Sequence, residues 1–191
     1  MSEPISEGTL PSLDSLFENI SSPIGRDLKL NLKRILEEGA LSPAEGLTAL
    51  LATATAEEHA PLALFAREAL AKSGMPKEQI QEAAESAGIM GMLNVYYRFR
   101  HLIDNEEEYR TTGLRMTALG RPLLGKVPFE MLSFALSVLN GCPSCIRSHE
   151  KVLREASVSV EKVHDLARLA AVVKGLKGLQ TASSHAGPNG A

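Results

Sequence analysis

The strongest constraint on the fold of this chain is a succession of helical segments that leaves little room for strands. Apolar residues recur at helical spacing from residue 13 to 180, and no segment keeps the apolar–polar alternation of a half-buried strand. Boundary signals separate the segments: Gly39 follows one of them, Ser42 is a good N-cap for the next, and Asn140-Gly141 ends a strongly apolar one. We therefore expect an all-α fold.

The two ends of the chain differ in composition from its middle. Residues 1–12 and 181–191 are rich in small, turn-forming and polar residues, and we expect both to be flexible. The chain has 191 residues, of which 44% are hydrophobic, enough to build one substantial core. We expect a single domain over residues 13–180. We also expect the segment 12–20, at the start of this domain, to be helical because it is amphipathic.

A weak internal repeat indicates that this domain has two parts. A shift of 83 residues lays residues 70–90 on residues 153–173, and both copies predict a helix, a short break and a second helix. The matched pairs are Leu70 and Leu153, Glu78 and Glu161, Ile80 and Val163, Glu82 and Asp165, and Ile89 and Val172. We expect two similar helical halves, over about 42–100 and 127–180.

Charge and hydropathy exclude several classes of protein. The net charge is -3 and no block of Lys or Arg is present, which argues against a nucleic-acid partner. We find no apolar run long enough for a transmembrane helix, and the first twenty residues lack the apolar core of a secretory signal. We expect a cytoplasmic protein with no membrane partner, and in that compartment a close pair of cysteines is more often catalytic or metal-binding than structural.

Both cysteines of the chain lie in the stretch NGCPSCIRSHE, residues 140–150. Pro143 fits the first turn of a helix, which places Cys142 at or beside the N-cap and Cys145 in the first turn. The helix dipole and the free N–H groups stabilise a thiolate there, most strongly at Cys142, and the Cys-x-x-Cys spacing allows a disulfide.

Two further side chains complete a candidate relay. His149 follows Cys145 by four residues and Cys142 by seven, so all three share one helix face. Glu130 precedes Asn140 by ten residues and His149 follows it by nine, so the two come level if the helices fold back on each other. A carboxylate in an apolar helix needs a partner, and His149 is the candidate.

Other interpretations of these residues remain open. The cysteines could be small buried hydrophobes, Glu130 a residue stabilised by the helix dipole, and His149 a solvated position. Cys142, Cys145, His149 and Glu130 could also be zinc ligands or part of an assembly device in a helical oligomer without enzymatic activity. We assign no function to the remaining histidines, which lie in polar stretches: His59, His101, His164 and His185.

The stretch FEMLSFALSVLNGCPSCIRSHE, residues 129–150, resembles the signature of the alkyl hydroperoxidase AhpD family, within the wider carboxymuconolactone decarboxylase-like group. Residues 27–32, 88–100 and 113–116 resemble the same family, so the likeness covers nearly the whole chain except its ends. The resemblance implies an all-helical fold of two similar halves that assembles as a homotrimer.

The resemblance also implies an activity. Members of the family reduce alkyl hydroperoxides and the oxidised peroxiredoxin AhpC, with electrons from dihydrolipoamide carried on a lipoylated acyltransferase and with no bound cofactor or metal. Carried over, Cys145 is the thiol that becomes a sulfenic acid, Cys142 resolves it as a disulfide, and Glu130 and His149 form the proton relay. The repeat would then leave the chemistry to the second half alone.

One residue departs from the family pattern. A second histidine usually stands directly before the second cysteine, and here that position is Ser144. A serine hydroxyl is not a base near neutral pH, so we expect the rate or its pH dependence to differ. A decarboxylase-like activity, as elsewhere in the wider group, does not require a dithiol, and the Cys-x-x-Cys pair argues against it.

Overall fold

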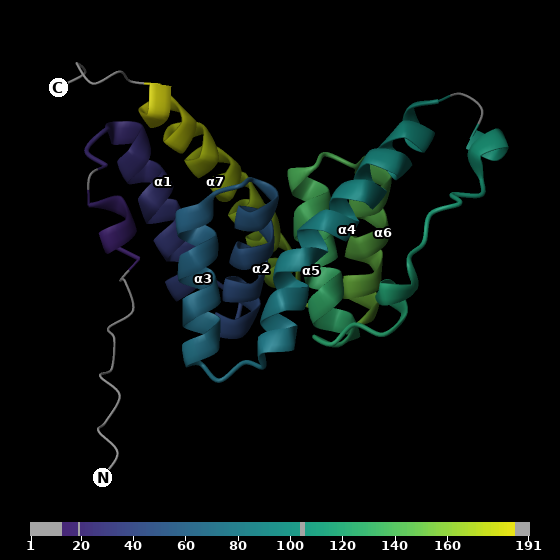
Figure 1. Ribbon diagram of the computed structural model, residues 1–191, viewed down its shortest axis with the longest axis horizontal. Helices are drawn as coiled ribbons and strands as arrows, with labels where there is room; N and C mark the ends of the chain where they lie inside the picture. The colour runs from purple at the N-terminus through teal and green to yellow at the C-terminus, as the bar shows by residue number, and fades with distance from the viewer. Residues whose placement is uncertain (1–12, 19, 104–105, 186–191) are drawn as a thin grey trace, which may run out of the picture.

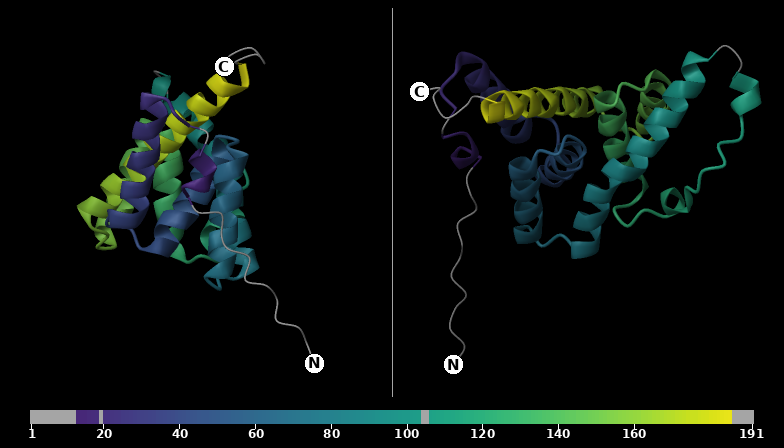
Figure 2. Two further views of the ribbon diagram at one scale, coloured as in Figure 1. Left: turned by 90° about the vertical axis from the view of Figure 1, so that its left-hand side faces the viewer. Right: turned by 45° about the horizontal axis from the view of Figure 1, so that its top comes forward.

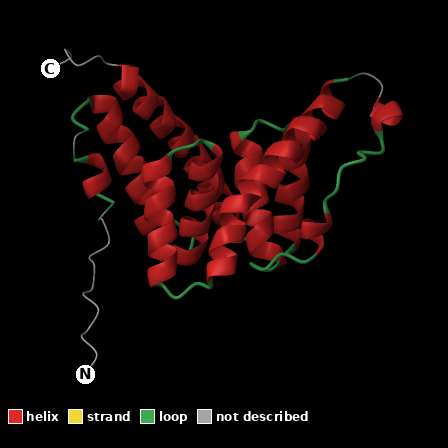
Figure 3. Ribbon diagram, in the orientation of Figure 1, coloured by secondary structure: helices red, strands yellow, loops and turns green. Residues whose placement is uncertain are grey.

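The computed structural model describes residues 13–18, 20–103 and 106–185, and over these ranges the regular structure is helical, with no strand. The all-α prediction is thereby confirmed (Figures 1 and 3). The α-helices are α1 (Pro23–Lys33), α2 (Pro43–Ala56), α3 (Ala60–Lys72), α4 (Lys77–Leu102), α5 (Lys126–Leu139), α6 (Pro143–Glu155) and α7 (Val160–His185). The short turns are η1 (Ser15–Phe17), η2 (Arg34–Glu38, π-helical), η3 (Glu106–Tyr109) and η4 (Thr117–Gly120).

The chain ends differ from expectation at two places. Over residues 13–18, the described stretch before position 19, the segment expected to be helical forms only the 3₁₀ turn η1, and Asp14 makes no side-chain cap but pairs with Lys29 and Lys33. At the other end α7 continues to His185, so the flexible tail expected from residue 181 is helical over its first five residues. Residues 1–12 and 186–191 lie outside the described part of the chain.

The two-halves prediction is confirmed by the helix boundaries. Adding 83 to the bounds of α2, α3 and α4 gives the bounds of α5, α6 and α7. The turns agree as well: a residue with positive φ precedes each N-cap of α3 and α6, namely Glu58 (φ 53°) and Gly141 (φ 63°). Each half is thus a hairpin of two helices followed by one long helix.

The long helices are exchanged between the halves. Helix α4 crosses from the first hairpin to pack on α5 and α6, while α7 packs back on α1 and α2, and the two form the arms of a V in Figure 1. Figure 2 shows α7 running beside α1. This exchange brings α4 against the hairpin that carries both cysteines.

Equivalent acids on the two long helices hold the segments that lead into the opposite hairpins. Glu82 on α4 accepts hydrogen bonds from the backbone N–H groups of Leu123 and Leu124, at 2.8 and 2.7 Å. Asp165 on α7 accepts one from Ala40 at 2.6 Å. Asp165 follows Glu82, and Leu123 follows Ala40, by the same 83 residues, so the halves are tied together reciprocally.

A leucine-rich core runs between the two hairpins. Its fully buried side chains include Leu50, Leu70, Leu132, Leu153, Leu166 and Leu169. Each such side chain contributes about 1.5–3 kcal/mol by leaving water. In the described part of the chain, no helix is both long enough and apolar enough to cross a membrane.

Candidate active site

The turn between α5 and α6 places the two cysteines. Gly141 adopts φ +63°, a conformation that glycine reaches without strain, and reverses the chain after Asn140. The Cys142 N–H then donates to the Ser137 carbonyl at 3.1 Å, and the Cys142 carbonyl accepts from Ile146 N at 2.9 Å. Cys142 is therefore the N-cap of α6, as the sequence predicts.

Cys142 and Cys145 are joined in a disulfide, with their Cα atoms 5.3 Å apart. The two sulfurs differ in their surroundings, because Cys142 is fully buried whereas Cys145 retains 7% of its surface. Pro143, at the first position of α6, leaves no N–H unpaired there. A reversible dithiol–disulfide pair fits this arrangement.

The structure brings Glu130 and His149 together across the hairpin. His149 Nδ1 lies 2.6 Å from Glu130 Oε2, and the two side chains retain 21% and 23% of their exposure. An ionised carboxylate only accepts hydrogen bonds, so His149 Nδ1 is the donor in this pair. The mid-helix hydroxyls of Ser133 and Ser137 bond back to carbonyls of their own helix, at 2.9 and 2.7 Å.

Cys145 opens onto a cavity of about 340 Å³, within the range typical of small-molecule sites. Most of its wall is apolar, contributed by α4 and by the segment around η4, and α6 supplies a polar side. The lining residues are Met90, Leu93, Tyr97, Met116, Leu119, Ser144, Cys145, Ser148 and His149. Cys142 is not among them, so a molecule in the cavity meets Cys145 first.

Ser144 lies beside the Cys142 sulfur and lines the same cavity as Cys145. Its hydroxyl is 3.5 Å from Cys142 Sγ, and its side chain lines the cavity with Cys145. Ser144 is therefore in a position to contact a molecule in the cavity, though its hydroxyl is not a base near neutral pH.

Buried polar residues that the sequence did not identify lie behind the cysteine turn. Asn94 on α4 has no exposed surface; its side chain donates to Ser137 Oγ and accepts from Asn140 Nδ2. Arg98, one turn further along α4, donates to the Asn140 carbonyl. The available signal was a single amide in the otherwise apolar stretch GIMGMLNVYY.

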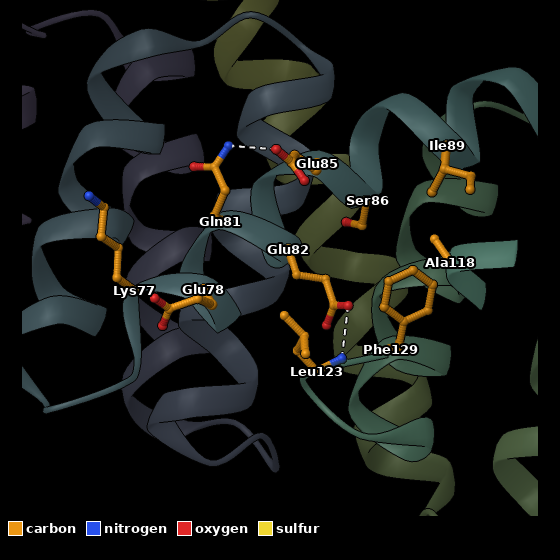
Figure 4. A pocket seen from close by; sticks show the side chains of 10 residues that line it. All are labelled: Lys77, Glu78, Gln81, Glu82, Glu85, Ser86, Ile89, Ala118, Leu123 and Phe129. Atoms are coloured by element: carbon orange, nitrogen blue, oxygen red, sulfur yellow. Dashed lines mark hydrogen bonds between the residues drawn. The ribbon is translucent and has the colours of Figure 1, made fainter. Parts of the chain in front are cut away.

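A larger cavity of about 530 Å³ lies along the N-terminal part of α4 (Figure 4). It contains no cysteine or histidine, and two of its three acids are bonded to other residues of its lining: Glu82 accepts from the Leu123 N–H, and Glu85 accepts from Gln81. Nothing in it resembles a nucleophile paired with a base. Among the described residues, no group of three or more His, Cys, Asp or Glu side chains is arranged to hold a metal ion, so the zinc interpretation finds no ligand set there.

His59 is not in the polar setting expected of it. Its side chain is 93% buried at the N-cap of α3, where Nδ1 accepts from Leu62 N at 3.3 Å. Burial lowers the pKa of His59, with a smaller contribution from the nearby Lys177 ammonium. This histidine stands where Cys142 stands in the second half.

Comparison with known proteins agrees with this geometry. A model of the carboxymuconolactone decarboxylase family matches residues 108–186, which include the whole cysteine hairpin. A relative named alkyl hydroperoxide reductase AhpD from Anaeromyxobacter dehalogenans (strain 2CP-C) is 38% identical over 184 residues, covering 95% of this chain and 98% of the relative.

Two further relatives carry the same name. The one from Streptomyces coelicolor is 41% identical over 165 residues, covering 85% of this chain and 91% of the relative. The one from Brucella anthropi is 40% identical over 167 residues, covering 85% and 93%. With identity at this level over nearly its full length, the chain belongs to the AhpD family of alkyl hydroperoxide reductases.

Proposed function

We propose that this protein is a thiol-dependent alkyl hydroperoxide reductase whose redox centre is Cys142 and Cys145. One observation carries the proposal: a Cys-x-x-Cys disulfide has one sulfur lining an apolar cavity, and a Glu130–His149 pair lies on the same hairpin. The apolar wall suits the alkyl group of an organic hydroperoxide, and His149 lines the cavity beside Cys145.

The first step takes place at Cys145. His149 Nε2 removes the thiol proton, and Glu130 stabilises the resulting imidazolium through Nδ1. The thiolate attacks the distal oxygen of the hydroperoxide, so an S–O bond forms and the O–O bond breaks. The departing alkoxide takes the proton from His149 and leaves as an alcohol, with Cys145 as a sulfenic acid.

The second step closes the disulfide. Cys142 sulfur attacks the sulfenic sulfur of Cys145; an S–S bond forms, the S–O bond breaks, and the hydroxyl leaves with the Cys142 proton as water. The Cα separation of 5.3 Å in the closed form lies within the usual range for a disulfide. In the third step two thiols of dihydrolipoamide reduce the disulfide and become its cyclic disulfide in turn.

The assignment of Cys145 as the peroxide-reacting thiol is supported by access. Helix position alone favours Cys142 as the more acidic thiol, since it is the N-cap. Cys142 is however fully buried and does not line the cavity, whereas Cys145 does. We therefore assign peroxide attack to Cys145 and resolution to Cys142.

The partners are proposed from the family. These are alkyl hydroperoxides, the peroxiredoxin AhpC, a lipoylated acyltransferase that supplies dihydrolipoamide, and two further copies of this chain in a homotrimer, in the cytoplasm. An exposed apolar row on α4, made of Met92, Val95, Phe99 and Leu102, supports self-association, because surfaces of this kind mark interaction sites. We propose no resident cofactor or metal.

The test is hydroperoxide consumption by purified protein with dihydrolipoamide as the sole reductant. We expect turnover in the wild type and none in Cys145→Ser, while Cys142→Ser should accumulate a sulfenic acid on Cys145 after a single turnover. Absence of turnover in wild-type protein whose two thiols are shown to be free beforehand would refute the peroxidase assignment. A fully active Cys145→Ser would refute the choice of sulfur.

A further inference from the structure

The turn that carries Cys142 is bound by side chains of α4 through a series of largely buried hydrogen bonds. Asn94 donates from Nδ2 to Ser137 Oγ at 2.9 Å and accepts at Oδ1 from Asn140 Nδ2 at 3.0 Å. Arg98 donates to the Asn140 carbonyl at 2.6 Å. Both polar ends of Asn140, its side chain and its carbonyl, are thus bound by α4.

This series of hydrogen bonds is connected to Cys142 in two ways. Asn140 is separated from Cys142 by Gly141 alone, the most permissive residue of the turn. Ser137, which receives the bond from Asn94, also accepts the Cys142 N–H on its carbonyl at 3.1 Å. The position of Cys142 therefore depends on α4, although no atom of α4 belongs to the redox centre.

The first half holds its equivalent turn differently. Ala54 and Glu57 stand where Ser137 and Asn140 stand, and the residue of α7 equivalent to Asn94 is Lys177. Lys177 donates to the Glu58 carbonyl at 3.2 Å, in an exposed contact. Lys174 pairs with Glu57 at 2.8 Å, with its own side chain largely exposed. An exposed lysine clamp is sufficient to hold this turn where no redox chemistry takes place.

A buried amide network is costly to build, because every member must find its partners inside the protein. The half with the disulfide carries such a network, and the half without it does not. We propose that Asn94, assisted by Arg98, is a positioning residue that sets the dithiol–disulfide equilibrium of Cys142 and Cys145.

The physical basis is the freedom of the turn in the reduced protein. When the disulfide is closed, the S–S bond itself restrains Cys142. When it is open, the α4 network keeps Cys142 beside Cys145, so closure loses less conformational entropy and the effective concentration of one sulfur at the other stays high. Loosening the network favours the dithiol and slows the resolution of a sulfenic acid on Cys145. This inference rests on the proposed dithiol cycle.

The experiment measures the disulfide equilibrium with dithiothreitol, with no hydroperoxide present. Oxidised and reduced forms are trapped by alkylation and counted by mass spectrometry in the wild type, Asn94→Ala, Arg98→Met and the matched control Lys177→Met. We expect Asn94→Ala, which loses two buried hydrogen bonds, to move the equilibrium about tenfold toward the dithiol, or about 30 mV for a two-electron couple. Arg98→Met should move it about threefold, because one bond is lost.

Lys177→Met separates this role from plain stability. It loosens the equivalent turn of the other half, so its melting temperature should fall while its disulfide equilibrium stays within about twofold of wild type. A second expected effect is that excess hydroperoxide converts Cys145 of Asn94→Ala to sulfinic acid faster than that of wild type, because resolution competes with further oxidation.

Two results would overturn the proposal: an equilibrium in Asn94→Ala and Arg98→Met within about twofold of wild type, or an equal shift in Lys177→Met. If Asn94→Ala does not fold, Arg98→Met decides, since its side chain is only half-buried. The dithiol–disulfide equilibrium is measured without peroxide turnover. If the wild type fails to reduce hydroperoxides but the variants still shift the equilibrium as expected, the proposed peroxidase function is refuted and this inference stands.

Discussion

The hairpin α2–α3 and the hairpin α5–α6 have the same helix lengths and turns, yet four equivalent positions carry different side chains. In the second half these positions are Glu130, Cys142, Cys145 and His149; in the first half they are Leu47, His59, Leu62 and Ala66. The two hairpins therefore have the same backbone arrangement although these four side chains differ. The proposed site therefore differs from the first half at four positions of a hairpin that forms in both halves.

The cavities of the two halves extend this comparison. A smaller cavity of about 150 Å³ in the first half is lined by His59, Leu62, Leu176 and Gln180, which are equivalent to Cys142, Cys145, Leu93 and Tyr97. Leu16, Phe17 and Ile20, from the segment before α1, also line it. In the second half the corresponding cover is Met116 and Leu119, and the cavity is about 340 Å³. Cavities thus form at equivalent positions in the two halves, and they differ in volume and in the segment that covers them.

The largest expected difference between the halves comes from the equivalent pair Cys145 and Leu62. Cys145→Ala should abolish peroxide turnover with little loss of stability. Leu62→Ala, in a fully buried position, should cost about 2–5 kcal/mol of unfolding free energy and leave the rate per folded molecule unchanged. Urea unfolding and steady-state turnover on both variants test this, and turnover lost in Leu62→Ala at full folding would show that the first half takes part in catalysis.

The next effect concerns the relay. His149→Gln or Glu130→Gln should lower kcat by about 10²–10⁴-fold, because general acid–base catalysis contributes on that scale. Leu47→Gln puts the same amide at the position equivalent to Glu130 and should leave kcat unchanged. Stopped-flow reduction of a hydroperoxide by the pre-reduced enzyme measures the chemical step directly. Equal rates in Glu130→Gln and wild type would remove Glu130 from the relay.

Much of this site was predictable from the sequence because its signals are local. Asn140-Gly141 ends one helix and Pro143 starts the next, which fixes Cys142 at the N-cap. Counting ten residues back and nine residues forward from Asn140 brings Glu130 level with His149, and the 2.6 Å contact agrees with that count. A short turn between two antiparallel helices leaves little freedom in their register.

Other features could not be predicted because their partners are distant or their chemistry is ambiguous. Asn94 is hydrogen-bonded to Ser137 and Asn140, which lie 43 and 46 positions later in the sequence, and no local sequence pattern predicts such contacts. The polar end of α7 reads as a flexible tail, but Thr181 and Ser183 direct their hydroxyls to carbonyls of their own helix, at 3.0 Å each. In the segment 12–20 an amphipathic pattern is present, but a short helix without a cap is marginal.

A smaller effect is expected at Ser144, where this chain departs from its family. Ser144→His should raise the turnover rate by up to about tenfold and add a titration near pH 6.5, the ordinary pKa of histidine. Ser144→Ala, which removes the hydroxyl 3.5 Å from Cys142 Sγ, should change the rate by less than about threefold. The pH profile of kcat/KM decides. An unchanged profile in Ser144→His would mean that His149 alone supplies the base in this protein.

The smallest expected effect is on stability in the first half, at His59. Burial holds the folded-state pKa of His59 below its ordinary value of 6.5, so the folded protein binds fewer protons there than the unfolded chain. The stability contributed by neutral His59 is complete above pH 6.5 and is lost as the pH falls through the folded-state pKa, since a protonated Nδ1 no longer accepts from Leu62 N. Urea midpoints measured from pH 8 to pH 5 should therefore fall more in the wild type than in His59→Asn, which keeps an N-cap acceptor that does not titrate.

His59→Ala should cost about 1 kcal/mol at pH 8, where the cap is lost without any change of charge. Parallel pH curves for the wild type and His59→Asn would mean that His59 binds protons equally in the folded and unfolded chain, so that burial does not lower its folded-state pKa. The histidine in the place of Cys142 would then be a helix cap and nothing more.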